Sequence, residues 1–207
     1  MDLRKKRLKQ SRQSNCKHCQ ALVQCHRLPE KSRLAGSDTT AGALRITLPY
    51  VITSPRVYNT LLAELSTSPL SNPVKDSEAR KLPYLQAVIR EGLRMCPPAA
   101  GHAYRLVPDD GDTLCGYHVP AGTKVGYNLQ GMMEDPKIWG EDAKLFRPER
   151  WLKGTPEDIR KMEATVDLAF GYGKWACLGK TIAQMTLNKT MAQVRDAFKT
   201  LKTRFHT

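Results

Sequence analysis

Residues 170–179 read Phe-Gly-Tyr-Gly-Lys-Trp-Ala-Cys-Leu-Gly, and they are the most informative segment of the chain for its fold class. A single cysteine, Cys177, stands in this glycine-rich turn, and an amphipathic helical pattern begins directly behind it. Gly171, Gly173 and Gly179 permit backbone angles that other residues avoid, and they let the chain approach a flat ligand closely. The stretch therefore predicts a turn that presents one sulfur to a metal.

The pattern behind the turn predicts a helix. From Ala183 through Leu187 and Met191, apolar residues recur at steps of three and four, so we expect the helix to begin near Leu178. Unpaired amides and the positive end of the helix dipole favour an anion at the position of Cys177, and this biases the sulfur toward the thiolate form. One thiolate without a second ligand suits haem iron better than zinc, whose sites need three or four protein ligands. The alternative is a buried, inert cysteine.

Three further motifs precede this turn in the chain. Residues 35–40 read Ala-Gly-Ser-Asp-Thr-Thr, residues 91–94 read Glu-Gly-Leu-Arg, and residues 146–151 read Phe-Arg-Pro-Glu-Arg-Trp. The four motifs, in this order and approximate spacing, resemble those of the cytochrome P450 family of cysteinate-haem monooxygenases. The residues in and around the motifs are most similar to those of fungal members. The resemblance implies a mainly α fold with a small β-sheet, of which this chain is the C-terminal portion.

The resemblance also implies a cofactor and the residues that bind it. The cofactor is haem b (iron protoporphyrin IX), with Cys177 as the axial ligand of the iron. The other cofactor-binding residues implied are Phe170, Gly171, Gly173, Gly179 and Arg105. Arg105 aligns with a basic position that often binds a haem propionate, and the alternative for it is an ordinary surface arginine.

Asp38 and Thr39 are the catalytic residues that the resemblance implies. An acid beside an alcohol is a plausible proton relay, and in the family such a pair delivers protons during the activation of dioxygen. Glycine in a helix interior lowers helix stability by about 1 kcal/mol relative to alanine, so Gly36 indicates that space is needed there for a ligand. The alternative for Ser37, Asp38 and Thr39 is a helix cap, a position that all three residue types favour.

Glu91 and Arg94 lie three residues apart, on one face of the helix expected over residues 85–96. Such pairs on a helix are usually solvated surface pairs. The resemblance implies instead that Arg150 joins them in a Glu-Arg-Arg network that stiffens the core behind the cysteine turn. This task is structural rather than catalytic.

One residue of the turn departs from the family pattern. Two residues before the cysteine the family usually places Arg or His, and here the position is Trp175. An indole donates one hydrogen bond but carries no charge, so it cannot replace a guanidinium salt link to a propionate. This predicts weaker cofactor retention than in a member with Arg there, with Lys174 as a partial substitute.

The middle and the cysteine content give weaker signals. Residues 116–125 carry turn residues between short strand-like runs and predict a hairpin. Ser54-Pro55 predicts a helix start.

Six cysteines in a chain without a secretory leader do not indicate a disulfide framework, and no stretch is long and apolar enough to predict a transmembrane segment.

The amino end is strongly basic. Residues 1–34 hold ten Lys and Arg against Asp2 and Glu30, a net of +8 out of the +13 of the whole chain. We expect this segment to be disordered or outside the fold, and residues 35–207 to form the C-terminal cytochrome P450 region. No nucleic acid is expected as a partner, although a basic nucleic-acid-binding protein is a distant alternative. Cysteines and histidines between Cys16 and His26 match no common zinc-finger spacing.

The function implied by the resemblance is monooxygenation of a small lipophilic molecule, with dioxygen and with electrons from an NADPH-dependent flavoprotein reductase. Lys174 and Lys180 flank the cysteine and could help to dock such an acidic partner. Because 207 residues correspond to roughly half of a family member, the alternative is a truncated, noncatalytic remnant or a partial gene model. Full-length fungal relatives suggest the endoplasmic reticulum membrane, whereas this chain alone is expected to be soluble.

Overall fold

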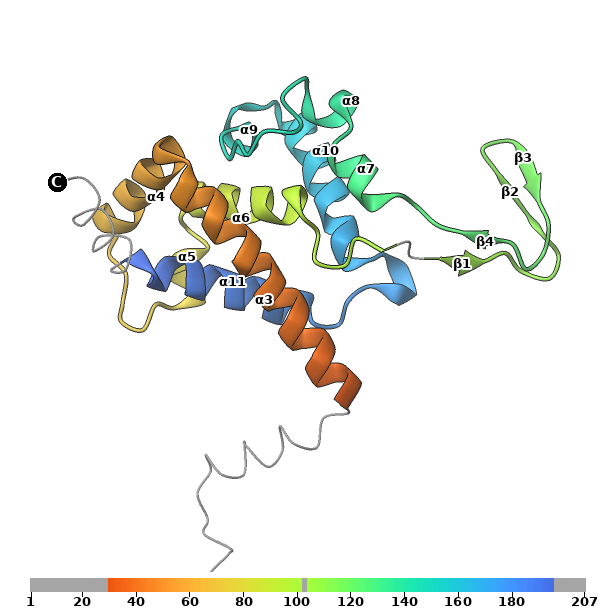
Figure 1. Cartoon of the computed structure of the whole chain (residues 1–207), viewed down its shortest axis with the longest axis horizontal. Coiled ribbons are helices and arrows are strands. Elements are labelled where there is room, and N and C mark those ends of the chain that lie inside the picture. The colour runs from red at the N-terminus through yellow and green to blue at the C-terminus, as the bar shows by residue number, and fades with distance from the viewer. Residues whose placement is uncertain (1–29, 102–103, 196–207) are drawn as a thin grey trace, which may run out of the picture. The chain divides into compact units, whose positions relative to one another are not determined.

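The computed structural model describes residues 30–101 and 104–195 and is mostly helical (Figure 1). The chain divides after Ser37 into two units, and the packing below concerns the second. The elements are α3 Glu30–Thr53, α4 Pro55–Thr67, α5 Asp76–Ala79, α6 Pro83–Met95, β1 Arg105–Leu106, β2 Asp112–Leu114, β3 Tyr117–Val119, β4 Lys124–Val125, α7 Leu129–Met133, α8 Pro136–Trp139, α9 Arg150–Lys153, α10 Pro156–Asp167, the 3-10 turns η1 Leu168–Phe170 and η2 Gly173–Trp175, and α11 Lys180–Gln193. The expected fold class, mainly α with a small β-sheet, is confirmed, and the strands described form two small antiparallel sheets.

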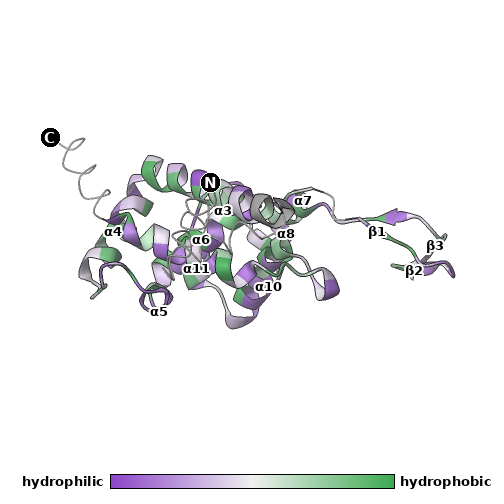
Figure 2. Cartoon of the chain, turned by 90° about the horizontal axis from the view of Figure 1, so that it is seen from below, coloured by the Kyte–Doolittle hydropathy of each residue, from purple (hydrophilic) through white to green (hydrophobic). Residues whose placement is uncertain are grey.

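Helix α6 lies at the centre of the second unit. It packs against α4, α9, α10 and α11, and nine of its thirteen residues are buried. Most other helices bury one face only, and in Figure 2 hydrophobic and hydrophilic segments accordingly alternate along the same ribbons. The largest apolar side chains without exposed surface come from α4, α6, α7 and α11: Leu61, Leu65, Leu85, Leu129, Met133 and Met191.

The start of α6 depends on a residue of another helix. Leu82 at the N-cap provides no side-chain hydrogen bond, and Pro83 has no N–H to satisfy. The carboxylate of Glu64, near the end of α4, accepts hydrogen bonds from the N–H groups of Tyr84 and Leu85, each at 2.8 Å. An acidic group also complements the positive end of the helix dipole, so α4 fixes where α6 begins.

Helix α3 crosses α6 closely at Gly92. A Cβ at Gly92 would overlap the hydroxyl of Thr47, which is buried on α3 and donates to the Ala43 carbonyl at 2.8 Å. The glycine inside the Glu91–Arg94 motif is therefore a packing requirement. Tyr50, one turn further along α3, stacks on Phe146 with the ring centroids 4.8 Å apart.

The strands pair differently from the sequence-based expectation. Residues 117–119 and 124–125 are strands, but they do not pair with each other as the expected hairpin over 116–125 requires. β3 pairs with β2, through a turn in which Cys115 and Gly116 adopt positive φ, and β4 pairs with β1. The expectation was wrong because the turn at Cys115 and Gly116 pairs β3 with β2, and the turn at Gly122 leads the chain back to the β1 segment rather than to β3.

Helix α11 follows the cysteine turn and begins at Lys180, two residues after the expected start. The predicted apolar stripe is buried at Leu187 and Met191, and its continuation beyond Arg195 lies outside the described residues. Predictions for residues 1–29, including the cysteines and histidines near Cys16, also lie outside them, so the division at residue 34 stays a prediction. No helix between residues 30 and 195, as far as the structure describes them, has the length and apolar character to cross a membrane.

Candidate functional site

The cysteine turn is folded back on itself. The N–H of Cys177 donates to the carbonyl of Phe170 at 2.7 Å, which closes residues 170–177 into a loop. Gly171 has φ +74°, and a Cβ there would lie 2.7 Å from the carbonyl oxygen of Trp175. Gly173 has φ +60° in open surroundings. These two glycines are therefore required by the loop itself, because other residues are strained at positive φ.

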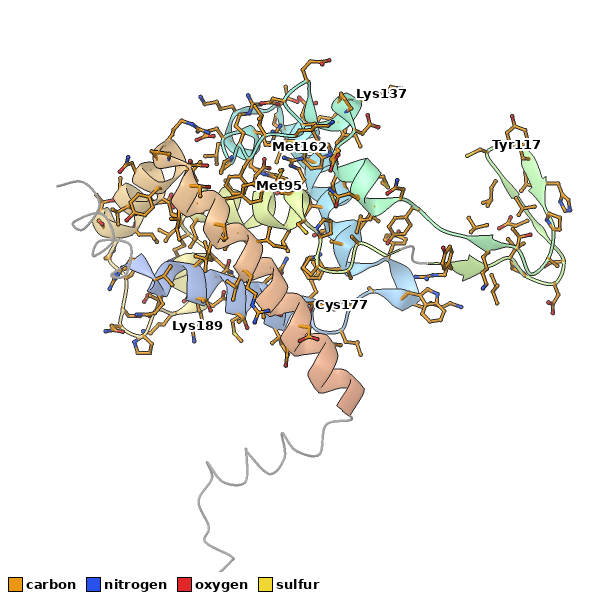
Figure 3. All side chains as sticks on the ribbon, in the orientation of Figure 1. Met95, Tyr117, Lys137, Met162, Cys177 and Lys189 are labelled. Atoms are coloured by element: carbon orange, nitrogen blue, oxygen red, sulfur yellow. The ribbon has the colours of Figure 1, made fainter. Side chains whose placement is uncertain are left out.

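The sulfur of Cys177 lies at the surface just before α11 (Figure 3), and the thiol is free. Gly179 has an ordinary φ of −84°, so its backbone does not require glycine. A Cβ at Gly179 would lie 3.7 Å from the sulfur, and its absence keeps the space beside the sulfur clear. Leu178 is fully exposed and Ile182 is 65% exposed, so apolar surface borders the thiol. The alternative of a buried, inert cysteine is excluded for this structure.

These features fit a flat, iron-containing group. Among residues 30–101 and 104–195 no three His, Cys, Asp or Glu side chains gather as a metal-binding set. Zinc needs three or four such ligands, whereas haem iron needs one axial ligand from the protein because the porphyrin supplies the others. An exposed thiol, a cleared position at Gly179 and adjoining apolar side chains match the second case.

Arg105 and Trp175 are brought together by the structure. Arg105 belongs to β1, and its guanidinium carbon lies 4.8 Å from the ring centroid of Trp175. The ammonium of Lys174 lies 5.5 Å from the same centroid. On the other side of Cys177, Lys180 pairs with Asp167 at 2.8 Å and also lies over the Phe170 ring. The cations that flank the cysteine are thus engaged within the chain.

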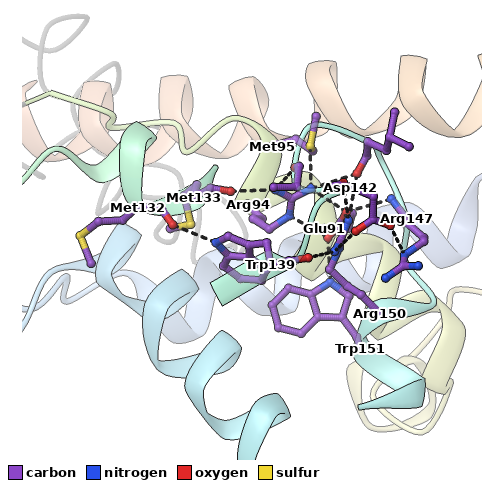
Figure 4. Close-up of polar contacts among 12 residues, drawn as sticks. Glu91, Arg94, Met95, Met132, Met133, Trp139, Asp142, Arg147, Arg150 and Trp151 are labelled. Atoms are coloured by element: carbon purple, nitrogen blue, oxygen red, sulfur yellow. Dashed lines mark hydrogen bonds and ion pairs between the residues drawn. The ribbon is translucent and has the colours of Figure 1, made fainter. Parts of the chain in front are cut away.

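Glu91, Arg94 and Arg150 meet in the interior (Figure 4), although sequence alone left a solvated surface pair open. Glu91 and Arg94 have no exposed surface, and they form two hydrogen bonds, at 2.8 and 3.0 Å. Arg150 donates to the same carboxylate at 3.1 Å. The indole N–H of Trp151 and the backbone N–H of Arg147 donate to it as well, at 3.0 and 2.8 Å. Both carboxylate oxygens of Glu91 are saturated.

The remaining donors of the two arginines bind the irregular segment between α7 and α9. Arg94 donates to the carbonyls of Met133, Ala143 and Leu145, and Arg150 donates to those of Trp139, Asp142 and Leu145. Asp142 adds a second carboxylate, 3.2 Å from Arg150. The network holds the carboxylates of Glu91 and Asp142 and the guanidinium groups of Arg94 and Arg150, and the side chain of Arg147 joins it through a 2.8 Å pair with Asp142. It fixes residues 133–145 through their backbone carbonyls.

Sequence alone did not indicate that Trp151 and Asp142 belong to this network. Trp151 stands inside the motif over residues 146–151, and the need of a buried indole N–H for an acceptor is a signal that could have found it. Asp142 lies in an irregular stretch without periodicity, so no sequence signal indicates its contact with Arg150.

Glu149, in the same motif, ties two helices to this region. It pairs with Arg56 of α4 and accepts a hydrogen bond from the hydroxyl of Tyr84 of α6 at 2.8 Å. Burial raises the pKa of the Glu149 carboxyl, but the hydrogen bonds from Arg56 and Tyr84 outweigh burial and leave this pKa below its usual value. Burial, and then the hydrogen bond with Glu149, raise the pKa of the Tyr84 hydroxyl well above its ordinary range.

Asp38 and Thr39 lie in the interior of α3, because this helix begins at Glu30. The helix-cap alternative is therefore excluded for them. Asp38 is exposed and Thr39 half-buried. They precede the crossing at Thr47 by eight or nine residues along the helix, which is about 12–14 Å at 1.5 Å per residue. A Cβ at Gly36 would meet no described atom within 4 Å.

Comparison with known proteins agrees with this geometry. The family model described as Cytochrome P450 matches residues 32–204. A cytochrome P450 monooxygenase (aba1) of Botryotinia fuckeliana is 43% identical over 169 residues, which are 80% of this chain and 33% of the relative. A cytochrome P450 monooxygenase (ABA1) of Pyricularia oryzae is 42% identical over 170 residues, with the same shares. A pisatin demethylase of Fusarium vanettenii is 39% identical over 160 residues, 77% of this chain and 30% of the relative.

The chain thus spans about a third of the length of these relatives, as expected for a portion of the family's fold. The family match extends over the cysteine turn, the buried carboxylate network and most of α3. With a family model over most of its length and an exposed thiol in the glycine turn, the chain belongs to the cytochrome P450 family.

Proposed function

We propose that this chain contributes the cysteine side of a haem-thiolate monooxygenase. The enzyme would oxidise a small lipophilic molecule with dioxygen and with electrons from an NADPH-dependent flavoprotein reductase. The observation that carries the proposal is the exposed, free thiol of Cys177 in a closed glycine turn before α11. Fungal relatives named as monooxygenases and a demethylase support an oxidative reaction.

The residues of the turn would hold haem b in distinct ways. Cys177 would provide the sulfur ligand of the iron, and Gly179 leaves room beside the sulfur. Gly171 and Gly173 shape the loop, Phe170 closes it through its carbonyl, and its ring is partly buried against the core. Arg105 offers a cation to the propionates. When bound, the group supplies the activation of dioxygen, and thiolate ligation favours O–O cleavage.

Asp38 and Thr39 would handle protons. An exposed carboxylate exchanges protons readily with water, and a neighbouring hydroxyl both accepts and donates hydrogen bonds. The two residues are consecutive on α3, and a Cβ at Gly36 would meet no described atom within 4 Å. We assign Asp38 to collecting a proton at its carboxylate oxygen and Thr39 to passing one on from its hydroxyl.

The Glu91 network would position the cysteine turn indirectly. Arg150 and Trp151 anchor α9 to α6, and α6 packs directly against α11 behind the turn. A rigid backing keeps the sulfur in one place without touching it, so Glu91, Arg94 and Arg150 have a structural task.

Haem titration of the full chain tests the proposal. Wild type should take up haem, and after reduction under carbon monoxide it should show the red-shifted band of a thiolate-ligated complex. Cys177→Ser should lose this band, because an alcohol does not provide thiolate ligation. Cys115→Ser changes another exposed, free thiol and is the matched control. A band that survives in Cys177→Ser overturns the assignment of Cys177 as the ligand. No haem uptake by wild type overturns the proposal and favours a noncatalytic remnant.

The proton relay is tested by the fate of electrons in a reaction with a flavoprotein reductase. Thr39→Ala should lower product formation by about 10²-fold, the lower range for a lost acid-base group, and should divert NADPH electrons to hydrogen peroxide. Haem uptake should not change. Thr53→Ala removes an exposed hydroxyl at the other end of α3 and is the control. Equal product yields from both variants would exclude Thr39 from the relay.

A further inference from the structure

Trp175 occupies the position two residues before the cysteine and makes a pair of contacts that its sequence context did not indicate. Its ring centroid lies 4.8 Å from the guanidinium carbon of Arg105 and 5.5 Å from the ammonium of Lys174. Both distances are within the reach of cation–π attraction, for which tryptophan is the best ring. We propose that Trp175 is an aromatic platform that holds Arg105 and Lys174 as a two-cation site for the carboxylates at the edge of a porphyrin. This inference rests on the proposed function, since it assigns further residues to the same cofactor.

The contact with Trp175 explains how Arg105, which is far from the cysteine turn in the sequence, is positioned to bind a carboxylate. Arg105 comes from the two-residue strand β1, which is paired only with the equally short β4. A long side chain on so small a ladder loses up to about 2 kcal/mol of rotamer entropy when a ligand immobilises it. Contact with the indole, together with a hydrogen bond from the guanidinium to the Tyr104 carbonyl at 2.8 Å, orders Arg105 before the ligand arrives, and such preorganisation raises affinity.

The charge of Lys174 also favours an anion at this site. Lys180, on the other side of Cys177, pairs with Asp167 and is thereby neutralised. Lys174 takes part in none of the ion pairs found in residues 30–101 and 104–195, and its contact is with the ring of Trp175. An aromatic ring attracts a cation without cancelling its charge, so Lys174 keeps its attraction for a carboxylate.

The contacts of Trp175 change the expected effect on haem binding of having tryptophan, rather than arginine or histidine, at position 175. The sequence predicts weaker cofactor retention, because the indole carries no charge. In the structure the indole gathers two charges from elsewhere, one from β1 and one from its neighbour in the turn. The affinity that the family obtains from an arginine at this position is then supplied through Trp175, which is a positioning residue.

Haem titration of full-chain variants tests the platform. Trp175→Leu removes the π-system but keeps an apolar side chain, and it should weaken haem binding roughly two- to fivefold, the range of an exposed cation–π contact. Trp175→Phe keeps a ring and should recover part of the loss. The same titrations with haem dimethyl ester, whose carboxylates are blocked, should show no difference between wild type and Trp175→Leu.

A second measurement uses the chain without haem. Trp139 and Trp151 are 3% and 4% exposed, whereas Trp175 is 59% exposed, so added quenchers report mainly on Trp175. Iodide is an anion and should be concentrated beside Arg105 and Lys174. Arg105→Gln and Lys174→Gln should therefore lower the quenching of tryptophan fluorescence by iodide, while quenching by neutral acrylamide stays the same.

The outcomes separate this inference from the proposed function. Haem binding through Cys177 that is unaffected in Trp175→Leu, or equally weakened for haem and its dimethyl ester, overturns the platform alone. Iodide quenching that does not respond to Arg105→Gln and Lys174→Gln overturns it as well. A chain with charge-dependent quenching but no Cys177-dependent haem uptake contradicts the proposed function, and with it the assignment of this site to a porphyrin.

Discussion

Glu91 is the residue on which most of the buried polar chemistry converges. Its carboxylate accepts five hydrogen bonds from Arg94, Arg147, Arg150 and Trp151. A buried charge is costly unless it is paired and hydrogen-bonded, and here both conditions are met. The network is therefore tolerable only when complete, because removal of any donor leaves a charge or an acceptor without compensation.

Two arginines of α6 allow a matched test of this point. Arg94→Gln leaves the buried carboxylate of Glu91 without its main partner and should destabilise the fold by about 3–5 kcal/mol. Arg90→Gln breaks the exposed pair with Glu163, at 2.9 Å, and should cost about 0–1 kcal/mol. Urea unfolding followed by far-UV circular dichroism measures both. Equal losses of unfolding free energy in the two variants would show that burial does not increase the contribution of the Glu91–Arg94 pair to stability.

At the scale of elements, the close crossing of α3 and α6 sets the position of the residues expected to be catalytic. Thr47 and Gly92 define the contact, and Tyr50 on Phe146 extends it toward the segment that carries Arg150. Asp38 and Thr39 belong to the same α3, so their placement depends on how closely the two helices pack. A substitution at the crossing should therefore shift Asp38 and Thr39, although neither of these residues is itself changed.

Glycine-to-alanine changes on the two helices test the crossing. Gly92→Ala places a Cβ onto the Thr47 side chain and should destabilise the fold by about 1–3 kcal/mol, despite the better helix propensity of alanine. Gly42→Ala, on α3, meets no atom within 4 Å and should stabilise by up to about 1 kcal/mol. Opposite shifts in the midpoint of urea unfolding are expected, and a stabilising Gly92→Ala would show that the helices can separate at no cost.

At the scale of the whole molecule, Glu149 joins segments that are far apart in the sequence. It binds Arg56 of α4 and Tyr84 of α6, and it directly precedes Arg150 of the buried network. Because the pKa of Glu149 is depressed in the folded chain, its contribution to stability is complete above the unfolded value of about 4.3. That contribution is lost as pH falls through the lower, folded value.

Acid unfolding of Glu149→Gln measures this linkage. Wild type should lose more stability than Glu149→Gln between neutral pH and about pH 3, because only wild type must take up a proton on this side chain when it unfolds. At neutral pH the variant should be the less stable of the two, since it loses the charge-assisted bond with Arg56. Parallel pH dependences would show that the pairing with Arg56 and Tyr84 does not persist in solution.

Local signals accounted for much of the fold. Pro55 marks a helix start, the stripe with Leu187 and Met191 marks α11, and both features appear in the structure. Strand pairing was not predictable in the same way, because residues 117–125 contain a plausible turn of their own. The pairing of β3 with β2 accompanies the positive φ of Cys115 and Gly116, and β4 pairs with β1, a segment that is not adjacent to it in the chain; periodicity reveals neither.

Residue types at fixed spacing were sufficient to identify the family and the members of the Glu91–Arg94–Arg150 set, and they indicated Cys177 as the proposed haem ligand. Only the tertiary structure decided that this set is buried, that Gly92 admits Thr47, and that Trp175 meets Arg105 from a separate strand. These contacts join residues 45 to 70 positions apart, and such pairings depend on how helices and loops pack rather than on local propensity.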